Sequence, residues 1–467
     1  MEFAAFKRAL EGVVMLLLLA TGIGLSVRGK FFQLTHFGSI LKRTLGSAFQ
    51  KTNRPSSGFT PFQALTTALA GSVGTGNVAG VAGAIVLGGP GAVFWMLVSA
   101  LFGMMTKFVE VTLAVRYRTR NGRGERVGGP MYYITACMKR RWHFLAYAFS
   151  LFGMLASFGV GNMTQVNTVA VTVVDAARTF SGAAFVGAEE TGLRLAFGIV
   201  LAAMTAVVII GGVRRIGAVT EKLIPFMSVA FVIVSLAVVA CNFDRLGGVV
   251  TSIVKGAFEG FRPAVGGAVG FSMREALRMG VSRGVFSNEA GLGSAPIAHA
   301  SAETRHPVEQ GMYGVMEVFI DTVVMCTLTG LTLLCAGIEL PYGSADAAGS
   351  VLMVRALGTV FGPGFSGAFV AVSLLFFAFS TLIGWSLYGV RCAEFLFGDG
   401  AAFWYRLVFV VLIVAGALAD VGFVWSLADL LNACMAIPNL IALTALSGTV
   451  FSLIRQHQKR SKLSGRF

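Results

Sequence analysis

The sequence predicts an all-α integral membrane protein with about 11 transmembrane helices. Two observations carry most of this prediction. The 467-residue chain is 55% hydrophobic and only 13% charged, against roughly 25% charged residues in an average soluble protein. Residues 55–106 contain no charged side chain at all. Because a bilayer-crossing helix needs about 20 mostly apolar residues, that stretch alone can hold two spans.

Eleven apolar segments follow one another along the chain. The first segment follows Lys7 and Arg8 and lacks a small-residue cleavage site, so we expect an uncleaved helix rather than a signal peptide. The segments comprise residues 11–27, 62–88, 92–115, 144–174, 193–213, 218–241, 250–282, 312–337, 364–396, 402–419 and 423–453.

The basic residues predict the orientation of these helices. The protein carries 37 Lys and Arg side chains and a net charge of +15. With the C-terminus in the cytoplasm, 27 of the 37 fall in cytoplasmic segments and eight on the opposite side. This asymmetry follows the positive-inside rule and places the N-terminus outside. Basic loops therefore explain the charge, and we expect no nucleic-acid partner.

Neither a catalytic nor a metal centre is predicted. The six cysteines include no C-x-x-C pair, and the five histidines include no H-E-x-x-H motif. Most of the cysteines lie in apolar segments, where they act as small packing residues. We therefore expect no enzyme activity and no cofactor.

The stretch "GSVGTGNVAG", residues 71–80, spells a G-x-G-x-x-A motif. A dinucleotide-binding turn needs a preceding strand and an acidic residue about 20 positions later, whereas apolar segments flank this motif and the next acid is Glu110. Two interpretations remain. The glycines either allow close helix packing or allow the span to unwind.

A second interrupted segment favours unwinding. The stretch "FRPAVGGAVGFSM", residues 261–273, follows four unbroken spans, and four more spans come after it. Two broken helices at matching places in two five-helix halves are typical of transporters built from an inverted repeat. We therefore expect an N-terminal helix and basic loop (1–57), two five-helix repeats (58–245 and 246–454) and a basic cytoplasmic tail (455–467).

Two unwound helices predict a specific chemistry. Bare backbone survives in a membrane only where it lines a protein cavity. Its freed carbonyls can coordinate sodium, and its freed N–H groups at a helix N-terminus can hold a carboxylate. A small zwitterion with a cation meets both needs, so the sequence predicts an amino-acid–cation symporter without a charged side chain in its pocket.

Four stretches resemble the alanine or glycine:cation symporters, also called sodium:alanine symporters. They are "VGTGNVAGVAGAIVLGGPGAVFWM" (73–96), "GGPMYYI" (128–134), "GVSRGVFSNEAGLGSAPIA" (280–298) and "FAFSTLIGWSLYGVRCAEFLFG" (377–398). The resemblance covers most of the chain from about Pro61 onward. It implies a leucine-transporter-like architecture, whose first core helix carries a comparable V-G-x-G-N break.

The resemblance also implies roles for individual residues. Thr75 and Gly76 would donate backbone N–H groups to the substrate carboxylate, and Gln165 would add a polar contact. The substrate pocket would be completed by Ala268, Val269, Gly270 and Phe271. Sodium would bind the carbonyls of Ala70, Val73 and Phe377 with the hydroxyls of Ser380 and Thr381. The family leads us to expect a bulky Phe at Ala268, so the smaller residue extends the expected substrates to glutamine.

Other polar residues have two open interpretations each. Asp321 either binds a cation or proton, since buried carboxylates in membranes are usually functional, or it only holds the bundle together. Trp385 packs on the substrate or only on its neighbours. Lys107 and Glu110 are expected to form an i,i+3 ion pair. Candidates for a gate, for coupling or for a structural network are Asn77, Arg283, Asn288 and Glu289, the last three at the inner end of the second broken segment.

The predicted function is sodium-coupled import of a small neutral amino acid (alanine or glycine, with glutamine as a further candidate) by alternating access. A proton-coupled symporter using Asp321 and a membrane channel or receptor without concentrative uptake remain alternatives. We expect a monomer in the bacterial inner membrane, with the lipid bilayer, the amino acid and sodium as its partners.

Overall fold

The computed structural model describes residues 2–48, 58–181, 185–260, 270–344 and 349–463. Within these ranges the chain is almost entirely helical, which confirms the predicted fold class. Its two-stranded antiparallel hairpin pairs β1 (Thr119–Arg120) with β2 (Arg126–Val127).

Twelve helices and three shorter segments make up the first part of the chain. They are α1 (Glu2–Arg28), α2 (Phe32–Thr35), α3 (Phe37–Ala48), α4 (Pro61–Ser72), the 3-10 turn η1 (Thr75–Asn77), α5 (Ala79–Gly88), α6 (Gly91–Arg116), α7 (Pro130–Cys137), the 3-10 turn η2 (Arg140–Trp142), α8 (Phe144–Phe158), the π-helical segment η3 (Gly159–Met163), α9 (Thr164–Ser181), α10 (Ala188–Ile210), α11 (Gly212–Cys241) and α12 (Phe243–Phe258).

The second part continues with helices that are more often interrupted. They are α13 (Met273–Asn288), α14 (Ala295–Ala300), α15 (Pro307–Val318), the π-helical segment η4 (Phe319–Cys326), α16 (Thr327–Cys335), α17 (Gly349–Phe361), α18 (Pro363–Phe397), α19 (Ala401–Leu418) and α20 (Val421–Leu463).

Ten of the eleven predicted apolar segments correspond to helices that can cross a membrane. Among the described residues, nine spans are long and apolar enough, and the bent pair of α4 and α5 brings the number to ten. The prediction for 250–282 is the exception. That stretch contains the end of α12, residues outside the described ranges, and the start of α13 with the charged side chains of Arg274, Glu275 and Arg278.

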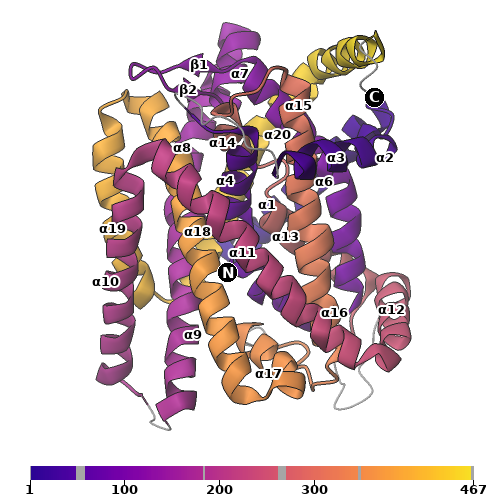
Figure 1. Cartoon of the computed structure of the whole chain (residues 1–467), viewed down its shortest axis with the longest axis vertical. Helices are drawn as coiled ribbons and strands as arrows, with labels where there is room; N and C mark the ends of the chain where they lie inside the picture. Colours follow the sequence, from indigo (N-terminus) through magenta and orange to yellow (C-terminus); the bar gives the residue numbers. More distant parts are fainter. Residues whose placement is uncertain (1, 49–57, 182–184, 261–269, 345–348, 464–467) are drawn as a thin grey trace.

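The two ends of the helix bundle are formed by different segments of the chain (Figure 1). The C-terminus, the β1–β2 hairpin, α7 and α3 lie together at the upper end. Helices α12 and α17 lie at the lower end, and α10 and α19 form one outer side. The upper end therefore gathers the basic segments 28–48 and 116–141.

Two π-helical segments interrupt otherwise continuous helices. Segment η3 lies between α8 and α9, and η4 lies between α15 and α16. Such segments insert an extra residue into an α-helix and are frequent at functional sites. In η3, Gly161 makes room for a neighbour, because a Cβ atom there would overlap the side chain of Trp385 on α18.

The C-terminal end of α18 is tied to the hairpin by ion pairs. Arg391 is buried and contacts Glu394 at 2.7 Å and Glu125 at 2.8 Å. Burial alone would raise the pKa of the Glu125 carboxyl, but the positive charges of Arg391 and Arg123 lower it below its usual value. These contacts hold α18 in place, which matters because α18 carries several of the predicted site residues.

Candidate functional site

The predicted break in the first long span is confirmed. Helix α4 ends at Ser72, Val73 adopts an extended conformation with φ −76° and ψ 94°, and the axis turns by 62° before α5. Between the two helices the backbone makes only the short turn η1. The bend leaves backbone groups of residues 70–75 without their ordinary helical partners.

Side chains take over two backbone donors at this break. In a continuous helix the N–H of Gly74 would donate to the carbonyl of Ala70. Instead it donates to Asn77 Oδ1 at 2.9 Å. The N–H of Thr75 likewise donates to Gln165 Oε1 at 3.1 Å, and the Thr75 hydroxyl reaches the same oxygen at 3.0 Å. The structure therefore brings together Thr75 and Gln165, two of the residues predicted to contact the substrate.

A freed carbonyl at the break is also bound by a side chain. The indole Nε1 of Trp385 donates to the carbonyl oxygen of Gly71 at 3.2 Å and to Glu289 Oε1 at 2.9 Å. Trp385 is buried. It therefore links α18 to the first break and to the residue that follows α13.

The glycines of the break allow three segments to meet closely. A Cβ atom on Gly74 would lie 2.8 Å from Thr381 Oγ1 and 3.0 Å from Gln165 Oε1. A Cβ atom on Gly71 would lie 2.8 Å from the hydroxyl of Tyr388. Real Cβ atoms essentially never lie closer than 3.0 Å to another atom, so any other residue at Gly71 or Gly74 would displace these side chains. Gly76 has more room and faces the ring of Phe286.

The predicted sodium ligands lie on the two sides of the contact between Gly74 and Thr381. Ala70 and Val73 are buried at the end of α4, and Phe377, Ser380 and Thr381 are buried on α18. The hydroxyls of Ser380 and Thr381 both donate to the carbonyl of Phe377, at 2.8 Å and 2.9 Å. Hydroxyl and carbonyl oxygens beside unwound backbone are the donor set that suits a sodium ion.

Asp321 lies at the centre of a second polar cluster beside the break. Its Oδ1 accepts from Asn77 Nδ2 at 2.8 Å, and its Oδ2 accepts from the hydroxyls of Ser287 at 2.8 Å and Thr322 at 2.7 Å. Asn288 Nδ2 donates to the Thr322 hydroxyl at 3.0 Å. Asp321 is fully buried, and none of the described Lys or Arg side chains forms an ion pair with it. Neutral donors alone surround this carboxylate.

A further helix break lies at residues 289–294, whereas Pro263, Gly266 and Gly267 of the predicted second break lie outside the described residues. Helix α13 ends at Asn288, and Glu289, Gly291 and Gly293 have φ values of 55°, 95° and 83° before α14 begins. This left-handed backbone favours glycine. The break faces the first one, because Ser287 bonds to Asp321 and Phe286 lies against Gly76.

The residues predicted to line the pocket from the second break are only partly within the described ranges. Ala268 and Val269 lie outside the described residues. Gly270 is exposed, and Phe271 packs against Tyr342 with ring centroids 5.8 Å apart. Since α13 is roughly 22 Å long at 1.5 Å per residue, its first turn is far from Ser287.

The predicted Lys107–Glu110 ion pair is wrong. Lys107 Nζ lies 3.1 Å from Glu317 Oε1 on α15, and both side chains are fully buried. The other oxygen of Glu317 lies 3.1 Å from His299 Nε2. Glu110 accepts instead from Asn439 on α20. Glu317 and His299 are site neighbours that sequence reasoning did not single out.

The predicted gating residues lie in three places. Asn77, Asn288 and Asp321 meet in the cluster beside the first break. Glu289 is fixed by Trp385 and by the hydroxyl of Ser294. Arg283 faces α20, where its Nη1 lies 3.9 Å from Asp429 Oδ1.

Known proteins resemble this chain in sequence over nearly its full length. The model of the sodium:alanine symporter family matches residues 3–466. The Sodium/alanine symporter AgcS of Methanococcus maripaludis is 43% identical over 97% of this chain and 96% of its own. The "Probable sodium/glutamine symporter GlnT" of Bacillus subtilis is 38% identical over 96% of this chain and 88% of its own.

A solved structure resembles the fold. The crystal structure of MhsT in complex with L-phenylalanine superposes with a TM-score of 0.59, covering 84% of this chain and 90% of that protein at 14% identity. At this identity the likeness concerns the fold alone, and it agrees with the predicted leucine-transporter-like architecture. The inverted repeat and its boundaries stay predictions.

Proposed function

The chain belongs to the sodium:alanine symporter family and is a secondary transporter, and we propose that it carries a small neutral amino acid into the cell together with sodium. Transport proceeds by alternating access, with the substrate site at the first break. Alanine and glycine are the proposed substrates, and glutamine is a third candidate because a relative is named for it.

The contact between Thr75 and Gln165 is the observation that supports this proposal most directly. The Thr75 N–H has no partner within a helix. It donates instead to the side-chain oxygen of Gln165, which a ligand oxygen can replace. A substrate carboxylate can replace that oxygen, because an N–H at a helix start favours an anion. Thr75, Gly76 and Gln165 are all uncharged, so they suit a zwitterion better than a charged substrate.

The coupling ion is proposed to bind between the end of α4 and α18. The carbonyls of Ala70, Val73 and Phe377 and the hydroxyls of Ser380 and Thr381 would supply its oxygen ligands. Support comes from the close approach of Gly74 to Thr381 and from the diversion of the Gly74 N–H away from Ala70. Binding sodium there would hold the first break against α18 and favour substrate binding next to it.

Uptake into proteoliposomes tests the proposal. The purified full chain is reconstituted, and labelled alanine, glycine and glutamine are offered with an inward sodium gradient or with an equal potassium gradient. We expect sodium-dependent accumulation above equilibrium for at least one of the three. Equilibration without accumulation would indicate a channel, and absence of any uptake would contradict the proposed substrate class.

Proton coupling through Asp321 is a second candidate, favoured by one observation. Asp321 is a buried carboxylate among neutral donors, so a proton would remove a costly charge. Under this alternative Asp321→Asn abolishes uptake, while Ser380→Ala with Thr381→Ala spares it. The sodium proposal predicts that the latter pair of changes raises the half-saturating sodium concentration.

For the membrane arrangement we propose a multi-pass protein of the cell membrane, monomeric, with its N-terminus outside and its C-terminus in the cytoplasm. The basic segments that gather at the upper end in Figure 1 support this orientation, since cytoplasmic loops carry the excess of Lys and Arg. A fluorescent reporter that folds only in the cytoplasm should be active when fused after residue 467. Activity of a periplasmic reporter there would reverse the orientation.

A further inference from the structure

The short turn between α7 and α8 carries three consecutive basic side chains. Lys139, Arg140 and Arg141 are all exposed, and residues 126–174 contain no Asp or Glu. Among the described residues, none of the three side chains forms an ion pair. The turn therefore presents a concentrated positive charge that the described part of the protein does not neutralise.

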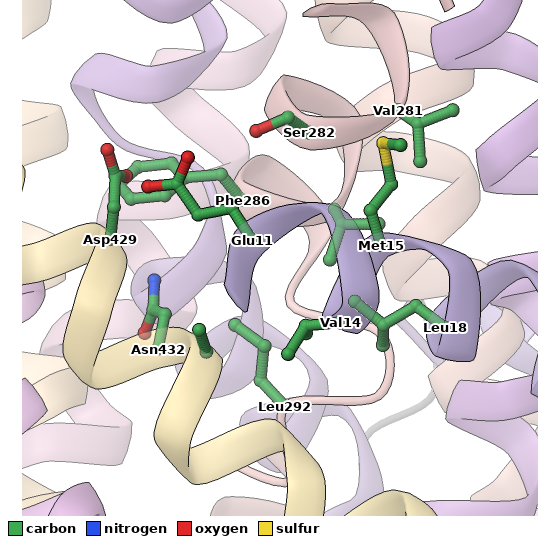
Figure 2. A pocket seen from close by; sticks show the side chains of 12 residues that line it. Glu11, Val14, Met15, Leu18, Val281, Ser282, Phe286, Leu292, Asp429 and Asn432 are labelled. Carbon is green, nitrogen blue, oxygen red and sulfur yellow. The ribbon is translucent and has the colours of Figure 1, made fainter. Parts of the chain in front are cut away.

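Two other charged clusters differ from this turn, because they contain both signs of charge. Glu11 and Asp429 lie at one end of a pocket between α1, α13 and α20 (Figure 2), and Arg283 contacts Asp429 at 3.9 Å. At the hairpin, Arg126 contacts Glu303 at 3.1 Å. Neither of these clusters needs a partner from outside the protein.

The backbone that carries the three cations is held in a fixed shape. The N–H of Trp142 donates to the carbonyl of Lys139 at 2.7 Å, and the N–H of His143 donates to the carbonyl of Arg140 at 3.1 Å. The side chain of His143 also bonds to the carbonyl of Met138, with 3.1 Å between Nε2 and the oxygen. A ligand of the turn would therefore not have to order this backbone first, which reduces the cost of binding.

An exposed apolar face of α8 begins directly after the turn. Phe144, Tyr147, Leu151 and Leu155 are exposed and follow one another at intervals of three or four residues, so they share one face of the helix. In a membrane such a face contacts acyl chains, while Trp and Tyr gather at the level of the lipid headgroups. Trp142, also exposed, and Tyr147 therefore place the three cations at headgroup level.

We propose that the turn and this face of α8 bind an anionic phospholipid of the membrane. The lipid phosphate lies among Lys139, Arg140 and Arg141, and the acyl chains lie along Tyr147 and Leu151. Guanidinium groups suit phosphate because they donate two parallel hydrogen bonds. Clusters of basic residues next to a membrane span attract anionic lipids, whereas a zwitterionic lipid would bring a positive charge of its own. A soluble anion would leave the apolar face without a role.

Helix α8 connects the turn to the proposed transport site. It continues through η3 into α9, whose first turn carries Gln165. The Ser157 hydroxyl of α8 donates to the carbonyl of Trp385 on α18 at 3.0 Å. A lipid that holds the start of α8 at headgroup level would therefore stabilise the helices that carry Gln165 and Trp385.

Thermal unfolding of the full chain in dodecyl maltoside tests binding directly. We expect dioleoyl-phosphatidylglycerol to raise the unfolding midpoint in a saturable way, with a half-saturating concentration at least tenfold below that of dioleoyl-phosphatidylcholine. Glycerol 1-phosphate, which has a phosphate but no acyl chain, should leave the midpoint unchanged at equal concentration.

Variants locate the site. The triple change Lys139→Gln, Arg140→Gln and Arg141→Gln should raise the half-saturating phosphatidylglycerol concentration tenfold or more. The matched control replaces Lys30, Lys42 and Lys459 with Gln. It removes three exposed cations at the same end of the bundle and should leave the half-saturating concentration unchanged.

Three results would overturn the proposal. An equal response to phosphatidylglycerol and phosphatidylcholine would exclude a preference for anionic lipid, and the unmodified protein decides this even if a variant does not fold. An equal response to glycerol 1-phosphate would indicate a site for soluble anions. An equal effect of the two triple changes would mean that only the overall charge of this end matters.

A transport measurement extends the test and rests on the proposed function. Proteoliposomes of phosphatidylcholine, with or without one quarter phosphatidylglycerol, are given an inward sodium gradient and labelled alanine. We expect phosphatidylglycerol to raise the initial uptake rate at least twofold for the unmodified protein and for the control, but not for the variant of the turn. Because the unfolding measurement needs no transport, a failure of the transport proposal remains distinguishable from a failure of this one.

Discussion

Trp385 donates its indole N–H to the carbonyl of Gly71 at 3.2 Å, and the same nitrogen lies 2.9 Å from Glu289. One side chain of α18 therefore joins the two broken helices. Gly71 precedes the first break and Glu289 opens the break at 289–294. Any movement that separates these helices must break at least one of the two contacts.

Replacing Trp385 with Phe should impair transport and stability together. The change keeps an aromatic ring but leaves the Gly71 carbonyl and Glu289 without their donor. We expect a loss of about 1–3 kcal/mol in unfolding free energy and at least a tenfold lower uptake rate. Denaturant unfolding in detergent and sodium-driven uptake measure the two effects. Trp404→Phe, at a residue that is 66% exposed, is the control and should change neither.

Gly74→Ala should abolish uptake. The added methyl group would lie 2.8 Å from Thr381 Oγ1, so it would push α18 away from the break. Gly83→Ala on α5 is the matched control, because nothing lies within 4 Å of its Cβ position and alanine favours a helix by up to about 1 kcal/mol over glycine. Normal uptake by Gly74→Ala would mean that the close contact has no part in transport.

Removing the α18 hydroxyls should weaken sodium dependence specifically. For Ser380→Ala with Thr381→Ala we expect the half-saturating sodium concentration to rise about tenfold, which corresponds to roughly 1.4 kcal/mol. Initial uptake rates at graded sodium concentrations measure this shift. Thr359→Ala removes a hydroxyl that also bonds to its own helix, and it should behave like the unmodified protein. An equal effect of both changes would argue against a sodium site on α18.

Removing one partner of the buried Lys107–Glu317 ion pair should strongly destabilise the protein. Glu317→Gln leaves the ammonium of Lys107 uncompensated in the interior, so we expect a destabilisation of about 3–5 kcal/mol. Lys107→Met combined with Glu317→Leu should recover most of it, because a well-packed apolar pair can replace a buried ion pair. The unfolding midpoints of Lys107→Met, of Glu317→Leu and of the double variant measure the coupling between the two side chains. Additive losses would show that the pair does not act as a unit.

The sequence predicted the fold class and the first break because both depend on local properties. Apolar length alone locates spans, and three glycines at positions 71, 74 and 76 allow a helix to unwind wherever it packs. The roles of Thr75 and Gln165 as substrate contacts were expected from the family resemblance and not from spacing, and their contact with each other was not predicted.

The break at 289–294 was not predicted, for a physical reason. Several stretches in this part of the chain contain residues that can interrupt a helix, and only the folded contacts of Ser287 and Asn77 with Asp321 show that this one lies beside the first break. The partner of Lys107 was missed similarly, since Glu317 lies on another helix while Glu110 is one turn away.

The π-helical segments η3 and η4 make the site sensitive to chain length. Each contains one residue more than an α-helical path would use, and a residue turns an α-helix by about 100°. Asp321 lies within η4, and Gln165 lies in the first turn of α9 after η3, where its Nε2 donates to the carbonyl of Val160 in η3. Deleting a single residue from either segment would let a regular helix form. All side chains on one side of the deletion would then rotate to a different face of the helix. Homologous transporters should therefore tolerate substitutions here far better than shortening.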